Sequence, residues 1–263
     1  MANIRVVVNG ALGKMGQTLV AALKQEPGIE LVGGIDVKAS EGKIPIDASR
    51  SVPLSSSLEG ILTSTKPDVL LDFTMPAAVM QTVRTTVKHG VNLVIGTTGL
   101  SAENVAEIGK LAKENNICAF VAPNFALGAV LMMVMAKLGA RYFDTAEIIE
   151  LHHDQKLDAP SGTALATAKM MADARGKAFN RPKQLDPNQS SRGLIAEGIN
   201  VHSVRLPGYV AHQEVIFGGI GQTLTIRHDS TGWDSFLPGI ILAVKEVQKH
   251  KGLTYGLDKL LGL

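Results

Sequence analysis

Hydrophobic and polar residues follow two alternating patterns in the first half of this chain. Short apolar runs rich in β-branched residues predict buried strands at residues 4–8, 31–35, 69–73, 93–95 and 118–121. Apolar residues with the spacing of one helix face separate most of them, around residues 15–23, 79–87 and 105–112. Buried strands that alternate with helices are typical of a parallel sheet covered on both faces. The pattern therefore predicts an α/β domain with a Rossmann-type, doubly wound parallel sheet.

The pattern changes after about residue 124. Helices are expected at 127–138 and after Ser161, a strand at 146–151, and a surface loop in the polar stretch 176–198. Further strands are expected at 199–205, 214–217 and 223–226, and a helix that returns to the first domain at 236–247. We therefore expect residues 1–125 and 235–263 to form one domain. Residues 126–234 should form a second, α+β domain with a mostly antiparallel or mixed sheet.

A glycine-rich loop directly follows the first predicted strand. Gly10, Gly13 and Gly16 have G-x-x-G-x-x-G spacing and open the first predicted helix. Glycine permits a tight turn and a close approach of the backbone to a pyrophosphate, and the helix N-terminus attracts that anion. Asp36 ends the second strand, where a carboxylate can accept hydrogen bonds from a ribose. Together these features predict a dinucleotide site, and the nearby Lys38 leaves the choice between NADH and NADPH open.

Two further loops follow predicted strands, where such a fold binds its ligands. They are Gly96-Thr97-Thr98-Gly99 and Ala122-Pro123-Asn124-Phe125. The alternative interpretation is that both are ordinary strand-to-helix turns, because turns favour the same residues.

The segment from Glu150 to Ala164 combines proton donors, a cation and a helix N-terminus. His152 and His153 are of the side-chain type whose unperturbed pKa lies nearest neutral pH, and Lys156 adds a positive charge. The Ser161-Gly162-Thr163 sequence is typical of an N-cap and first turn, whose free N–H groups attract a carboxylate or phosphate. The pattern predicts a site that binds and protonates a small acid. Consecutive histidines lack the usual spacing of zinc ligands, so no metal site is expected.

Composition narrows the class of protein. The 26 Lys and Arg residues nearly balance the 24 Asp and Glu residues, so the composition gives no sign of the basic surface that nucleic-acid binding requires. The one cysteine, Cys118, cannot form an internal disulfide, which favours a reducing compartment. The first residues do not resemble a signal peptide, and no apolar run approaches the roughly 18 residues of a membrane-spanning helix. We expect a soluble, cytoplasmic protein without nucleic-acid or membrane partners.

These motifs together resemble one known family. The glycine loop, Phe73-Thr74, the loops at 96–99 and 122–125, and above all the segment from His152 to Thr163 are similar to dihydrodipicolinate reductase. That family, also called 4-hydroxy-tetrahydrodipicolinate reductase, belongs to the diaminopimelate route to lysine. The resemblance covers essentially the whole chain. It implies reduction of a small cyclic dicarboxylate to tetrahydrodipicolinate with NADH and/or NADPH, by a homotetramer built through the sheet of the central domain.

The resemblance also implies roles for individual residues. His152 matches the family's proton donor, and Lys156 its second proton donor. His153, Gly162 and Thr163 match substrate-binding positions, to which the helix pattern adds Ser161. The matching cofactor-binding positions are Gly10, Ala11, Leu12, Gly13, Lys14, Met15, Asp36, Gly96, Thr97, Thr98, Ala122, Pro123, Asn124 and Phe125.

Two positions depart from the family pattern. Val37 stands where some members that use NADPH well have arginine, which favours NADH without excluding dual use. Trp233 stands where many relatives have a basic residue, which puts any role of that basic residue in substrate binding or subunit contact in doubt here.

Two other functions remain as alternatives, a nucleotide-sensing protein without catalysis and a dehydrogenase of amino or keto acids.

Overall fold

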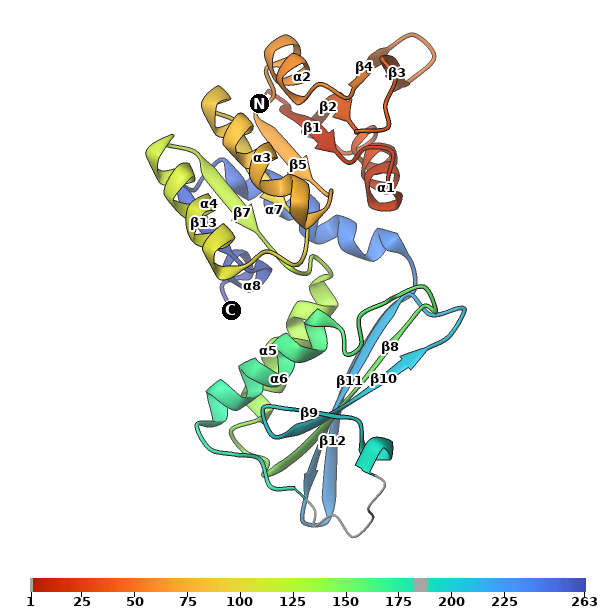
Figure 1. The fold of residues 1–263 in the computed structure, drawn as a ribbon, viewed down its shortest axis with the longest axis vertical. Coiled ribbons are helices and arrows are strands. Elements are labelled where there is room, and N and C mark those ends of the chain that lie inside the picture. Colours follow the sequence, from red (N-terminus) through yellow and green to blue (C-terminus); the bar gives the residue numbers. More distant parts are fainter. Residues whose placement is uncertain (1, 182–188) are drawn as a thin grey trace. The chain divides into compact units, whose positions relative to one another are not determined.

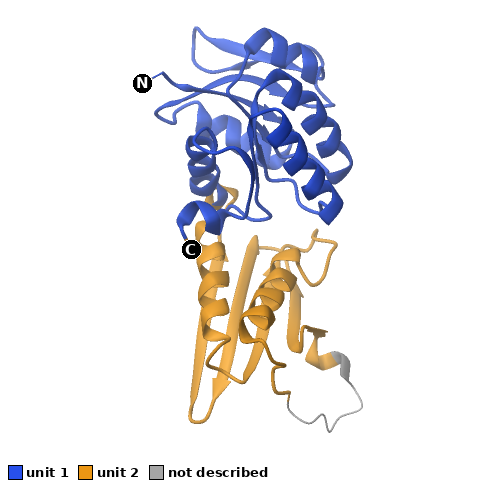
Figure 2. Ribbon diagram, turned by 90° about the vertical axis from the view of Figure 1, so that its left-hand side faces the viewer, with its two compact units in different colours: residues 1–125, 236–262 blue, residues 126–235, 263 orange. Residues whose placement is uncertain are grey.

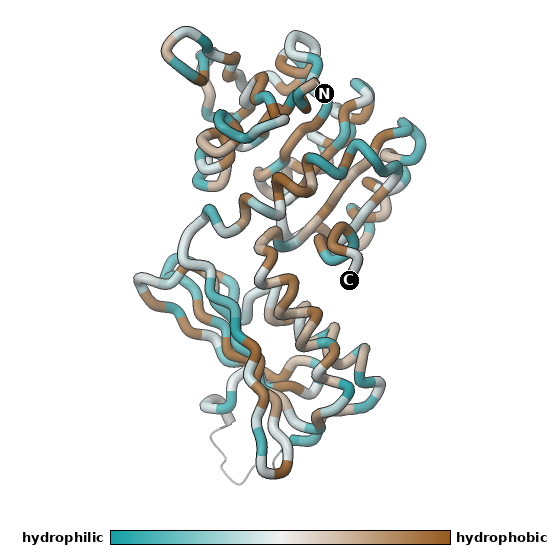
Figure 3. Tube along the Cα trace, turned by 180° about the vertical axis from the view of Figure 1, so that it is seen from behind, coloured by the Kyte–Doolittle hydropathy of each residue, from teal (hydrophilic) through white to brown (hydrophobic). Residues whose placement is uncertain are grey.

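Two compact units make up the protein, whose computed structural model describes residues 2–181 and 189–263. Unit 1 comprises residues 1–125 and 236–262, and unit 2 comprises residues 126–235 together with Leu263 (Figure 2). The chain therefore leaves unit 1 once, forms unit 2 from one continuous segment, and then completes unit 1. Figure 3 shows that hydrophobic residues occur along the strands and helices of both units, interrupted by hydrophilic ones.

Unit 1 is built on an eight-stranded sheet, called sheet A here, with the order β13-β7-β6-β5-β1-β2-β4-β3 (Figure 1). All neighbouring strands pair in parallel except β3 and β4, which form an antiparallel hairpin at one edge. The strands are β1 (Ile4–Asn9), β2 (Ile29–Ile35), β3 (Gly42–Pro45), β4 (Ser51–Ser55), β5 (Val69–Asp72), β6 (Asn92–Ile95), β7 (Cys118–Val121) and β13 (Gly252–Tyr255). The direction of strand succession reverses between β1 and β5, and such a switch point is where open α/β sheets bind ligands.

Helices cover both faces of sheet A. They are α1 (Lys14–Leu23), α2 (Leu58–Thr65), α3 (Pro76–Thr86), α4 (Ala102–Glu114), α7 (Leu237–Val247), α8 (Leu257–Leu261) and the 3-10 turn η1 (Val87–His89). One buried cluster joins α2, α3 and α4 to the face of sheet A that includes Val7, Leu70 and Leu93. Helix α7 contacts β6 and β7, and α1 contacts β1 and β2. The predicted Rossmann-type, doubly wound sheet is thereby confirmed.

Unit 2 is built on a five-stranded mixed sheet, sheet B, with the order β12-β11-β8-β10-β9. Its strands are β8 (Thr145–His152), β9 (Leu194–Ala196), β10 (Ile199–Arg205), β11 (Ala211–Gly219) and β12 (Gln222–Ser230). Strands β8 and β10 are parallel, and the other neighbours are antiparallel, as predicted for a mostly antiparallel or mixed sheet. Helices α5 (Leu127–Gly139) and α6 (Gly162–Arg175) pack on one face around Ile148, Val215 and Phe217. Short 3-10 turns lie at Gln189–Arg192 (η2) and Trp233–Phe236 (η3).

The prediction of one long loop at residues 176–198 is wrong in part. Residues 194–196 form β9, which pairs antiparallel with β10, and η2 precedes it. Residues 182–188 of that stretch lie outside the described part of the chain. Strand β9 is three residues long and largely exposed, so it lacks the hydrophobic alternation that identifies longer strands.

Candidate functional site

The buried carboxylate of Glu150 lies two residues before His152 on strand β8. Its side chain is fully buried, and its two oxygens accept four hydrogen bonds. Oε2 accepts from His152 Nδ1 at 2.5 Å and from Arg205 Nη1 at 2.8 Å. Oε1 accepts from Arg205 Nη2 at 2.8 Å and from the backbone N–H of Ser161 at 3.2 Å. One carboxylate thus links strand β8, strand β10 and the start of α6.

Strand pairing explains how Arg205 reaches Glu150. Strands β8 and β10 run in parallel with Arg205 opposite His152, so the guanidinium lies beside the end of β8. Besides its bidentate contact with Glu150, Arg205 donates to the carbonyl of Asp158 at 2.6 Å and to that of Val204 at 2.7 Å. Arg205 therefore ties the loop after β8 to the strand beside it.

Glu150 keeps its negative charge in this buried place. Burial by itself raises the pKa of Glu150, but hydrogen bonds from His152, Arg205 and Ser203 outweigh burial and lower that pKa to about 2. A buried charge is tolerated when it is paired and its lone pairs are filled, as they are here. Glu150 is therefore a hydrogen-bond acceptor at any pH near neutral.

The loop between β8 and α6 carries the other predicted substrate residues. Lys156 Nζ contacts Asp158 Oδ1 at 2.7 Å, and the Lys156 backbone N–H donates to the carbonyl of His153 at 3.2 Å. Ser161 caps α6, because its Oγ accepts from the N–H of Ala164 at 3.2 Å. The first turn of α6 contains no acidic residue of its own, and the Glu150 carboxylate lies at the start of the helix, where it accepts from the N–H of the cap residue Ser161. His152, His153, Lys156 and the 161–163 turn thus lie in one continuous segment of unit 2.

The glycine loop of unit 1 approaches its neighbours closely. Gly10 has φ +85°, and a Cβ there would lie 2.6 Å from the carbonyl oxygen of Phe73. A Cβ on Gly16 would lie 2.0 Å from the carbonyl oxygen of Gly10. Gly13 caps α1 without a side chain, and the first turn, which includes Lys14 and Met15, has no acidic residue. This loop can present backbone N–H groups to a phosphate, as the dinucleotide site requires.

Asp36 lies at the end of β2 beside the glycine loop. Its carboxylate accepts from the backbone N–H of Leu12 at 3.0 Å and from that of Lys38 at 2.9 Å. The Val37 side chain between them is 87% exposed. The backbone of Gly10 and Ala11 donates to the carbonyl of Ile35 at 2.8 and 3.0 Å, which joins this strand end to the loop. An acidic group next to the phosphate loop fits a ribose hydroxyl.

The loops after β6 and β7 lie at the same edge of sheet A, because both strands are parallel to β1. Thr97 is buried, and its Oγ1 donates to Asp72 Oδ1 at 2.8 Å, whereas Thr98 is exposed. Gly96 packs against the ring of Phe73, where a Cβ would lie 2.1 Å from a ring carbon. The Phe73 ring also contacts that of Phe125, with centroids 5.8 Å apart.

The Ala122–Phe125 loop completes this edge. Ala122 and Phe125 are buried, Pro123 is exposed and Asn124 is half-buried. The Ala122 backbone N–H donates to the carbonyl of Ile95 at 3.1 Å, which holds this loop against the end of β6. All the predicted cofactor residues therefore lie at the carboxyl ends of β1, β2, β6 and β7.

Several residues of these sites are not among the predicted ones. In unit 2 they are Glu150 and Arg205. In unit 1, Asp72 accepts from Thr97, from Thr74 Oγ1 at 2.8 Å and from Asn9 Nδ2 at 2.9 Å. The sequence carried a signal for Glu150, because this residue lies two positions before His152 and residues i and i+2 of a strand share a face. Arg205 had no such signal, because its contact depends on the pairing of β8 with β10.

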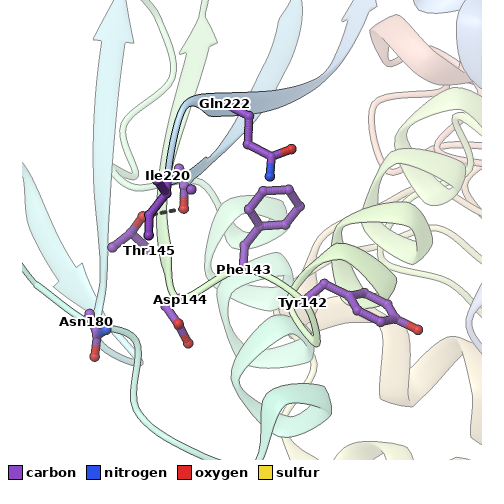
Figure 4. Close-up of a pocket in the computed structure, with 9 residues that line it drawn as sticks. Tyr142, Phe143, Asp144, Thr145, Asn180, Ile220 and Gln222 are labelled. Carbon is purple, nitrogen blue, oxygen red and sulfur yellow. Dashed lines mark hydrogen bonds between the residues drawn. The ribbon is translucent and has the colours of Figure 1, made fainter.

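A separate pocket lies at the other end of sheet B, where β8 begins (Figure 4). Its lining comes from the segment after α5, the hairpin turn between β11 and β12, and Asn180. Thr145 Oγ1 donates to the carbonyl of Gly218 at 2.8 Å there. The pocket contains none of the predicted site residues.

Within residues 2–181 and 189–263, no group of three His, Cys, Asp or Glu side chains is placed to hold a metal ion. No helix in the same residues has the length and apolar character needed to cross a membrane.

Family models and relatives match the whole chain. The model described as dihydrodipicolinate reductase, N-terminus, matches residues 4–125, and the model of the C-terminus matches residues 128–261. The chain belongs to the dihydrodipicolinate reductase family. A 4-hydroxy-tetrahydrodipicolinate reductase of Dehalococcoides mccartyi is 53% identical over 264 residues, which cover 100% of both chains. That of Moorella thermoacetica is 50% identical and covers 99% of both chains.

A solved structure of this family is also similar. Dipicolinate-bound dihydrodipicolinate reductase from Paenisporosarcina sp. TG-14 is 44% identical, with a TM-score of 0.85 over 98% of this chain and 99% of that one. The family expected from the motifs is confirmed. The chain is therefore an oxidoreductase that reduces 4-hydroxy-tetrahydrodipicolinate in lysine and diaminopimelate biosynthesis, and its family and Rossmann-type fold imply a nicotinamide cofactor.

We expect the buried charge of Glu150 to make stability depend on pH below about 4.5. The folded-state pKa of about 2 lies below the ordinary value of 4.5, so the unfolded chain binds a proton that the folded chain does not. The ionised carboxylate should therefore contribute about 3 kcal/mol at neutral pH, lost as pH falls from about 4.5 to about 2. Urea unfolding at several pH values, followed by the fluorescence of the single tryptophan, Trp233 of unit 2, measures this.

Glu150→Gln should flatten this dependence, whereas Glu59→Gln, at a side chain that is 68% exposed, should leave it unchanged. Equal slopes for Glu150→Gln and the unaltered protein would contradict the assignment.

Proposed function

We propose that unit 1 binds the dinucleotide, that unit 2 binds a small dicarboxylate, and that His152 donates a proton to it. The observation that carries this proposal is the segment after β8, where an imidazole, an ammonium and the positive end of α6 follow one another within twelve residues. The dipicolinate bound to the Paenisporosarcina reductase supports a dicarboxylate as the substrate here. The diacid carries two negative charges, which suit Lys156 and the first turn of α6.

In this proposal each residue has a distinct task. His152 provides the proton, since imidazole titrates near neutral pH. Lys156 binds a carboxylate and serves as a second proton donor. His153 and the backbone of Ser161, Gly162 and Thr163 hold the substrate.

The nicotinamide site of the proposal uses the carboxyl ends of β1, β2, β6 and β7. Residues Gly10–Met15 would surround the pyrophosphate, and Asp36 would accept hydrogen bonds from the ribose. The loops Gly96–Thr98 and Ala122–Phe125 would hold the nicotinamide half. When bound, the cofactor supplies the hydride. The close glycine contacts and the uncapped α1 fit such a group.

Replacement of either proton donor should reduce turnover and spare the cofactor site. We expect His152→Gln and Lys156→Ala each to lower kcat by roughly 100-fold or more, because a positioned proton donor contributes about 10²- to 10⁴-fold. The measurement is loss of nicotinamide absorbance with freshly generated 4-hydroxy-tetrahydrodipicolinate as the substrate. Calorimetry should give an unchanged Kd for NADH in both variants.

Unaltered turnover in both variants would contradict the assigned roles. A chain that binds NADH but never oxidises it would instead be a nucleotide sensor. Turnover of amino or keto acids in a substrate panel would indicate another dehydrogenase.

We further propose that the enzyme prefers NADH but also accepts NADPH. The Asp36 carboxylate repels a 2′-phosphate, whereas Lys38 lies close enough along the chain to attract one. Kinetics with both cofactors should give the higher kcat/KM with NADH. Val37→Arg should shift the ratio towards NADPH by roughly tenfold, about 1.4 kcal/mol, whereas the matched Val37→Leu should not. A higher kcat/KM with NADPH for the unaltered protein would contradict this proposal.

A homotetramer built through sheet B completes the proposal. Ile148 and Val215 face α5 and α6, so their neighbours Ile149 and Ile216 point to the opposite face of the sheet. In the described residues no helix of unit 2 has its core contacts on that face, where Ile149 lies opposite Glu214 and Ile216 opposite Glu147, so a face of mixed apolar and charged residues is open to association.

Light scattering after size-exclusion chromatography should give four times the chain mass. Ile216→Asp should lower that mass. Leu165→Asp, at an exposed position of α6, should not. A monomeric mass for the unaltered protein would contradict the tetramer.

A further inference from the structure

The contact between Glu150 and His152 fixes one ring nitrogen of the histidine. Glu150 Oε2 lies 2.5 Å from His152 Nδ1. A carboxylate that is ionised near neutral pH has no proton to give, so Nδ1 must be the donor of this bond. The proton of a neutral His152 therefore lies on Nδ1, and Nε2 is the nitrogen that can exchange a proton with another molecule.

The carboxylate itself cannot turn away from the ring. Arg205 holds both of its oxygens, and the Ser161 N–H takes a further lone pair of Oε1. The guanidinium is held in turn by the carbonyls of Val204 and Asp158. A bidentate arginine contact fixes the plane of a carboxylate, and the further bonds from His152 and Ser161 hold its two oxygens in place.

Other histidine–carboxylate pairs of the described residues use a more exposed carboxylate, including His212 with Asp229, whose side chain is 39% exposed. His202 contacts Glu147 through Nε2 at 2.8 Å, and the Glu147 side chain is 37% exposed. His89 contacts Glu59 at 2.9 Å, and the Glu59 side chain is 68% exposed. Glu150 is fully buried and held from three sides, so its effect on a histidine is not weakened by water.

We propose that Glu150, held by Arg205, is a positioning residue that fixes His152 with its Nδ1–H towards the carboxylate and Nε2 towards the substrate. The proposal rests on the proposed role of His152 as proton donor. In the donation step the Nε2–H bond of the imidazolium breaks, its electron pair stays on Nε2, and the proton forms the new bond at the substrate atom. The neutral ring that remains keeps its Nδ1–H bond to Glu150, so the ring does not turn between cycles.

Glu150→Gln tests this directly. Arg205 should hold the amide oxygen and turn the amide NH2 group towards Nδ1, which then must accept and moves the ring proton to Nε2. Solid-state NMR of protein labelled with 15N-histidine should report Nδ1–H for His152 in the unaltered enzyme and Nε2–H in the variant. The signal is assigned by its loss in His152→Gln.

Kinetics of the same variant should separate positioning from binding. We expect kcat to fall by roughly 100-fold while KM and the Kd for NADH stay within about twofold, because the lost function is proton delivery. The double variant Glu150→Gln/His152→Gln should be no slower than His152→Gln alone, since Glu150 acts through the histidine. Glu59→Gln is the matched control and should leave kcat and the His152 signal unchanged.

Glu150→Gln leaves the guanidinium of Arg205 beside a neutral amide and can destabilise the fold, because breaking a buried pair leaves an uncompensated charge. Glu150→Gln/Arg205→Gln removes both charges together and should fold while still losing the Nδ1–H signal and the turnover. An unchanged His152 signal with unaltered kcat in a folded variant would overturn the proposal. A double variant much slower than His152→Gln would also overturn it. Unaltered turnover in His152→Gln would contradict the role of His152 as proton donor. The NMR signal of His152 in Glu150→Gln tests the positioning role independently of that result.

Discussion

The proposed substrate site of unit 2 depends on one buried negative charge. Glu150 has lost all contact with water, and the free energy of that burial is offset by an arginine, a histidine and a backbone N–H. Each of these partners belongs to a different part of unit 2. The charge therefore holds the end of β8, the end of β10 and the start of α6 in register. The residues that bind and protonate substrate in the proposed mechanism lie between those three points.

The loops of unit 1 follow a different physical rule. In unit 1, close backbone approach rather than charge pairing sets the geometry, because Gly10 and Gly16 lie where any Cβ would collide with a carbonyl oxygen. The parallel direction of β1, β2, β6 and β7 brings four loops to one edge of sheet A. The Asp72 carboxylate below this edge joins the loops after β5 and β6 through Thr74 and Thr97.

The sequence predicted most of this, and the exceptions have physical causes. Continuous apolar runs such as β1 and β7 were predicted within a residue or two, because burial on both faces leaves a continuous hydrophobic signal. The hairpin β3–β4 and strand β13 escaped prediction, since edge strands are short and partly exposed. The partners of His152 were missed for another reason. The contact of Arg205 with Glu150 spans 55 positions and exists through strand pairing alone.

The order of strands in sheet A has a consequence for synthesis of the chain. Strand β7 ends at Val121, but its neighbour β13 begins at Gly252, after the whole of unit 2. While a ribosome makes the intervening segment, β7 is an open edge of a hydrophobic sheet. Unit 2 is continuous, so it can fold as soon as it emerges. Unit 1 begins first and must finish last, and its exposed edge during that interval is where a nascent chain would be captured by a chaperone or by another copy of itself.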